Sequence, residues 1–88
     1  MTDLGTDTTP AEVQFIRAEL LAGLTFARIA RAANYQPKFE RNRINARKAY
    51  DARLRFIPTT RLSARDADEV KSKLAELKAD LQNLGENI

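Results

Sequence analysis

The apolar residues near the C-terminus constrain the fold more than any other feature of this chain. They recur in steps of three and four residues, the spacing that places side chains on one stripe of an α-helix. The series is Ala67, Val70, Leu74, Leu77, Leu81, Leu84 and Ile88. Ser63 can cap the start of this helix through the backbone of Asp66, and Gly85 suits its end. The pattern predicts a helix over residues 63–84 that packs on other helices.

A first helix is predicted over residues 10–33. Thr9 and Glu12 can form a capping box, and Pro10 is favourable at the first helical position. Residues 1–8 are polar, small and without periodicity, so they are expected to form a flexible tail.

This first helix carries two apolar stripes on opposite sides. The stripe expected to face the core contains Val13, Ile16, Leu20, Leu24 and Ala27. Its phase continues across Gly23, which predicts one unbroken helix. The second stripe contains Phe15, Ala18, Ala22, Phe26, Ile29 and Ala33. One bundle cannot easily bury both stripes, so the second is either covered by other segments or forms a surface for a partner or a second copy. The candidate partner-binding residues are Phe15, Ala22, Phe26 and Ile29.

The middle helix, predicted over residues 37–57, is strongly basic and ends before Pro58. Its inner face is predicted to contain Phe39, Ala46, Ala49, Tyr50, Leu54 and Ile57. Arg53 lies on the same face, so its charge must reach water or find a carboxylate. The outer face carries Glu40, Arg41, Ile44, Arg47, Lys48, Asp51 and Arg55, which are either solvated or directed at phosphate.

Charge is distributed unevenly along the chain. Residues 28–65 carry a formal charge of +9, and the segments before and after them carry −3 each. The acidic segments can neutralise the basic one within the molecule, or the basic one can bind an anionic partner. With the apolar patterns, this predicts a single all-α domain over residues 9–88, folded as an antiparallel three-helix bundle.

Composition argues against an enzyme. The chain contains no cysteine and no histidine, which removes disulfides, the imidazole and thiolate ligands of zinc sites, and the usual general base near neutral pH. Ser63 is better explained as a cap, and Ser72 lies on the predicted outward side of its helix. No cofactor, metal site or small-molecule substrate is expected. The lack of a long apolar segment or signal peptide predicts a cytoplasmic protein that does not insert into a membrane.

One part of the chain resembles the tetratricopeptide repeat. The second helix of that repeat follows A-x3-[FY]-x2-A with a later proline, and the first contains G-x2-Y. The matching positions here are Gly23, Phe26, Ala46, Tyr50, Arg53 and Pro58, with Arg53 in place of the second alanine. The resemblance covers residues 20–58 and implies a single, distorted repeat-like hairpin with an extra helix. The same region is similar to small bacterial helical proteins, which implies no activity.

A second resemblance is to the LuxR-type and sigma-like helix-turn-helix. The segment LLAGLTFARIARAA resembles the entry into its first motif helix, with Gly23 and Thr25 at the turn. This resemblance implies that the basic helix, over residues 38–55, is a recognition helix in the major groove. The candidate nucleic-acid-binding residues are Arg41, Ile44, Arg47, Lys48 and Arg55.

The sequence therefore supports two functional hypotheses. The first is a non-enzymatic helical protein that mediates protein–protein association, as an adaptor or a homo-oligomer. The alternative is a DNA-binding protein that uses its basic helix. The two hypotheses make different predictions at Gly23. A helix-turn-helix has a turn at this residue, whereas the apolar pattern predicts a helix that continues through it.

Overall fold

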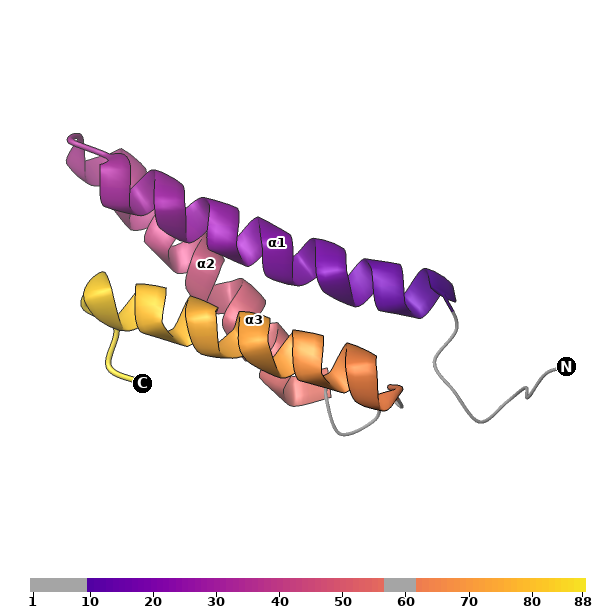
Figure 1. Ribbon diagram of the computed structural model, residues 1–88. Helices are drawn as coiled ribbons and strands as arrows, with labels where there is room; N and C mark the ends of the chain where they lie inside the picture. The colour runs from indigo at the N-terminus through magenta and orange to yellow at the C-terminus, as the bar shows by residue number, and fades with distance from the viewer. Residues whose placement is uncertain (1–9, 57–61) are drawn as a thin grey trace, which may run out of the picture.

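Three α-helices make up the fold in the computed structural model, which describes residues 10–56 and 62–88 (Figure 1). They are α1 (Pro10–Ala32), α2 (Gln36–Phe56) and α3 (Ala64–Asn83). The chain runs along α1, returns along α2 and runs along α3 in the direction of α1. The predicted all-α, antiparallel three-helix bundle is confirmed, and its described helix boundaries agree with prediction to within one residue. The predicted tail, the Thr9 cap and the end of the basic helix at Ile57 lie outside the described residues.

Both predicted caps of α3 are confirmed. The backbone N–H of Asp66 donates to Ser63 Oγ over 3.1 Å. At the other end, Gly85 adopts a positive φ of 98°. The N–H of Gly85 donates to the carbonyl of Gln82, and that of Glu86 donates to the carbonyl of Leu81. This pair of bonds is the Schellman arrangement, which turns the chain away from the helix and back towards α2.

The core lies along the shared axis of the three helices. The α3 seam is buried from Val70 to Leu81 and half-buried at Ala67, Leu84 and Ile88. The inner stripe of α1 is buried as predicted, except that Val13 is half-buried. The α2 helix contributes Ala46 and Tyr50 to this cluster. The buried cluster consists of Ile16, Leu20, Leu24, Ala27, Ala46, Tyr50, Val70, Leu74, Leu77 and Leu81.

Gly23 lies within α1, and the helix is unbroken there. A β-carbon at this position would lie 2.9 Å from Leu77 Cδ2 and 3.0 Å from Ala49 Cβ. The glycine therefore allows α2 and α3 to approach α1 closely, which explains why a residue of low helix propensity is present. The prediction of one continuous helix is confirmed, and the turn that the helix-turn-helix resemblance places at Gly23 is not formed.

The inner face of α2 contains a paired charge. Arg53 is 3% exposed, and its Nη1 donates to Glu19 Oε1 over 2.8 Å, as the sequence requires of a cation on this face. The prediction for Leu54 is wrong, because this side chain is 48% exposed. The helix turns about 100° per residue, so Arg53 occupies the buried arc at this level and Leu54 falls outside it.

Candidate protein-binding face

The outward side of α1 carries no charged residue. At about 100° per residue, the uncharged residues cover about 140° of the helix circumference. We call this surface the α1 outer face. It consists of Ala11, Gln14, Phe15, Ala18, Leu21, Ala22, Thr25, Phe26, Ile29 and Ala32. The charged residues of α1 all lie on the remaining arc, towards α2 and α3.

Large apolar side chains are exposed on this face. Phe15 is 62% exposed and Leu21 is 63% exposed, and between them lie the exposed alanines Ala18 and Ala22. The structure thus places Phe15 and Ala22, two of the predicted partner-binding residues, at the surface of the face.

The other two predicted partner-binding residues lie deeper. Phe26 is half-buried and packs against the core, and Ile29 is also half-buried. Phe26 therefore contributes to the monomer as well as to the face, which makes Phe15 the better residue for testing association. Leu21 was missed by the sequence prediction because it lies about 100° around the helix from the centre of the second stripe. The signal that identifies it is the absence of charge between it and that stripe.

A shallow apolar cavity lies beside Leu21, between α1 and α3. Its volume is about 170 Å³, and most of its surface is apolar. The lining residues are Arg17, Leu20, Leu21, Leu24, Glu69, Val70 and Lys73. The cavity extends the uncharged surface towards α3, with charged groups at its rim.

Ion pairs border the N-terminal half of the face. On the α3 side, Arg17 Nη2 lies 2.8 Å from Glu69 Oε1 and 3.1 Å from Asp66 Oδ1. The hydrogen bonds to Glu69 raise the pKa of Arg17. On the α2 side, Glu19 accepts from Arg53. Charges at this half of the face are therefore satisfied within the molecule.

Unpaired cations border the C-terminal half. Arg28 lies on the same stripe as Leu21, because the two are seven residues apart. Ala49 is the α2 residue that lies against Gly23 of α1. Lys38 and Arg41 lie on the neighbouring part of α2, within about 80° of Ala49 around the helix. All three are exposed, and the structure gives none of them an ion pair within residues 10–56 and 62–88.

The outer side of α2 holds the residues predicted to contact nucleic acid. Arg41, Lys48 and Arg55 are exposed, and Ile44 is 42% exposed. Arg47 differs from them, because its Nε donates to Asp51 over 3.1 Å and its Nη1 donates to Glu86 over 2.5 Å. Four of the five predicted residues therefore face solvent, and the fifth is held by carboxylates of the same chain.

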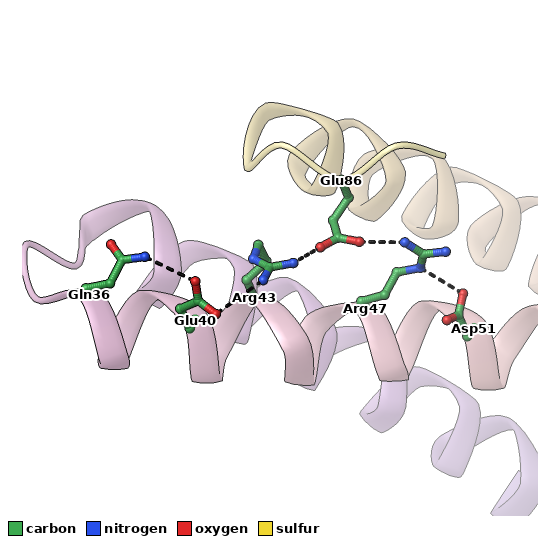
Figure 2. A network of polar contacts seen from close by, with 6 residues as sticks. All are labelled: Gln36, Glu40, Arg43, Arg47, Asp51 and Glu86. Atoms are coloured by element: carbon green, nitrogen blue, oxygen red, sulfur yellow. Dashed lines mark hydrogen bonds and ion pairs between the residues drawn. The ribbon is translucent and has the colours of Figure 1, made fainter.

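Figure 2 shows how the chain after α3 reaches Arg43 and Arg47 of α2. The carboxylate of Glu86 lies between Arg43 and Arg47 of α2, and its side chain is 9% exposed. Burial alone would raise the pKa of Glu86, but the hydrogen bonds from Arg47 and Arg43 outweigh it and hold the pKa below 4.5. With Arg53 paired to Glu19, part of the basic segment is neutralised inside the fold. No sequence signal singled out Glu86, because its role depends on the turn at Gly85.

Within the described ranges, no group of three or more acidic, histidine or cysteine residues could hold a metal ion. None of the helices there has a stretch both long and apolar enough to cross a membrane. Comparison with protein-family models, with curated proteins and with solved structures found no match to this chain.

Proposed function

We propose that this chain is a non-enzymatic, cytoplasmic helical protein that mediates protein–protein association, as an adaptor or a homo-oligomer, through the α1 outer face. The observation that carries the proposal is the exposure of Phe15 and Leu21 on a helix side that has no charge along its whole length. Contiguous exposed apolar surface is typical of interaction sites, whereas single exposed apolar residues are common everywhere.

The other helices supply the contrast within the same molecule. The outward side of α3 carries Arg65, Asp68 and Glu76, and that of α2 carries Arg41, Lys48 and Arg55. A helix side that faces only water is normally polar or charged, and on these two sides the exposed Ile44 of α2 stands among charged residues. The α1 outer face lacks that feature, and covering it with a partner removes apolar area from water at about 25 cal/mol per Å².

Site-specific photo-crosslinking tests the proposal in cells that express the chain. A benzoylphenylalanine at Phe15 is expected to give discrete adducts with a protein, either another protein or a second copy. The same probe at Ser72, which is exposed on α3, is the matched control and should give none. Leu21→Asp should abolish the adducts of the Phe15 probe while circular dichroism shows an unchanged helix content.

Equal adducts from the two probe positions, or adducts that persist in the Leu21→Asp variant, would contradict the proposal. Light scattering of the purified chain then separates the adaptor from the homo-oligomer. A dimeric or larger mass that returns to the monomer mass in Leu21→Asp identifies self-association.

Nucleic-acid binding by α2 is the second candidate. It is favoured by the row of exposed cations Arg41, Lys48 and Arg55, none of which has an ion pair among the described residues. Binding to a generic DNA duplex should then weaken steeply with salt and with Lys48→Glu. Arg47 is a poor probe, because its substitution would also release Glu86.

A further inference from the structure

We infer that the occupant of the α1 outer face is an amphipathic helix of a different protein, with acidic residues beside its apolar stripe. The inference rests on the proposed function, and it adds the chemistry of the partner. Three features of the face lead to it: the small residues along its centre, the cations at one end of it, and the fact that those cations form no ion pair within residues 10–56 and 62–88.

The small residues favour a helix as the occupant. Ala11, Ala18, Thr25 and Ala32 recur every seven residues, and Ala22 lies beside them. Small side chains allow the backbone of a second helix to approach closely, and heptad spacing keeps the two helices in register. Phe15 and Leu21 stand on either side of this strip as exposed apolar contacts. Since α1 has 23 residues, it is about 35 Å long and can contact a partner helix of about 20 residues.

The charges at the borders favour acidic groups on that partner. At the C-terminal half of the face, Arg28 lies on one border, and Lys38 and Arg41 lie on the other. At the N-terminal half, Arg17 and Glu19 are already paired with α3 and α2 respectively. A bound helix therefore meets unsatisfied positive charge on both sides of its apolar stripe at one end. Glutamate or aspartate at those positions supplies the complement.

The described residues of a second copy do not supply this complement. If two α1 outer faces packed in parallel, the borders that carry Arg28 and Arg41 would meet borders of the same sign. If they packed antiparallel, those cations would meet the other copy's N-terminal half, where the border residues Glu12, Arg17 and Glu19 already have interactions of their own. Within the described part of the chain, neither arrangement brings a carboxylate that is not already engaged to the three cations.

Phosphate and lipid fit the face less well. A nucleic-acid backbone could pair with Arg28, Lys38 and Arg41, but it offers no apolar surface to cover Phe15 and Leu21. An anionic bilayer offers both, yet most of the strip between those two residues is alanine. Alanine contributes little to insertion and much to close helix packing.

The test uses the full chain and two labelled helical peptides of 20 residues. Both carry leucine and alanine in one heptad stripe. One has glutamate at every position beside the stripe, and the other has lysine. Fluorescence anisotropy at low and moderate salt should give a dissociation constant at least about tenfold lower for the glutamate peptide, because exposed ion pairs each contribute modestly. The preference should shrink as salt rises.

Paired variants locate the effect. Lys38→Glu combined with Arg41→Glu should remove the preference for the glutamate peptide. Lys71→Glu combined with Lys78→Glu changes the net charge equally at exposed sites on α3 and is the matched control that should retain it. Phe15→Asp should weaken both peptides at least about tenfold, because it disrupts the apolar contact they share. Circular dichroism confirms that each variant is folded.

The outcomes separate this inference from the proposed function. Equal binding of the two peptides, weakened by Phe15→Asp, overturns the acidic partner and leaves the association face standing. Binding that is indifferent to Phe15→Asp overturns both. Self-association through Leu21 overturns the inference in favour of a second copy. Tighter binding to anionic vesicles or to a DNA duplex than to the glutamate peptide overturns it in favour of lipid or nucleic acid. Failure of both peptides to bind also overturns it.

Discussion

The two sides of α1 have similar composition but different surroundings. The inner side contains leucine, isoleucine, alanine and Gly23, and two helices cover it. The outer side contains phenylalanine, leucine, isoleucine and alanine, and nothing in the described part of the chain covers Phe15 or Leu21. Apolar composition alone therefore does not decide which side of a helix becomes core.

The difference lies in what the other helices can reach. The α3 helix has one apolar seam, which faces α1 and α2, and the inner face of α2 is narrow and contains Arg53. Together they can cover only one side of α1. The uncovered side shows that the described part of the chain leaves apolar surface exposed, which is the physical basis for proposing a partner.

The largest expected effect comes from one pair of neighbouring leucines. Leu20 is buried, and Leu20→Ala should lower the free energy of unfolding by about 2–5 kcal/mol, because it removes core contacts and leaves a cavity. Leu21 is exposed on the other side, and Leu21→Ala should change it by less than about 0.5 kcal/mol. Urea unfolding followed by circular dichroism measures both. Similar losses in the two variants would mean that the outer face is covered within the monomer.

A second pair of neighbours should show a smaller contrast. Gly23→Val places methyl groups against Ala49 and Leu77, and this overpacking should cost about 1–3 kcal/mol in the free energy of unfolding. Ala22→Val adds comparable bulk on the outer face and should cost less than about 1 kcal/mol, mostly through helix propensity. Thermal and urea unfolding of both variants provide the measurement. A stable Gly23→Val protein would show that α1 does not need the close approach.

Most of the fold was predictable because its signals are local. The seam of α3, the Ser63 cap, the Gly85 turn and the continuity of α1 across Gly23 each follow from spacing or backbone chemistry within a few residues. The expectation that Arg53 needs a carboxylate was confirmed for the same reason, since one cation on an apolar face is visible in the sequence. The identity of that carboxylate was not predicted, because Glu19 lies on another helix.

The candidate site was only partly predictable. The second stripe of α1 was visible, but its periodicity included the half-buried Phe26 and omitted the exposed Leu21. A helical wheel shows which residues share a side, whereas the extent of burial depends on where α2 and α3 lie. The same limit explains the error at Leu54 and the failure to anticipate that Glu86 would hold Arg43 and Arg47.

The smallest expected effect concerns the ion pairs between Glu86 and the arginines of α2. Their contribution to stability can be compared with that of the outer face of α1. The pKa of Glu86 in the folded state lies below 4.5. Its ion pairs therefore contribute fully to the free energy of unfolding above that pH, and the contribution is lost as pH falls through the folded-state pKa. Glu86→Gln should destabilise the protein at pH 7 and make its stability less dependent on pH below 4.5.

Glu76→Gln, at an exposed pair with Lys73, is the matched control for the loss of one carboxylate. Urea unfolding at pH 7 and at pH 3 measures the difference between the variants. Curves for Glu86→Gln that parallel those of the wild type at both pH values would show that the contacts of Glu86 with Arg43 and Arg47 contribute nothing to stability.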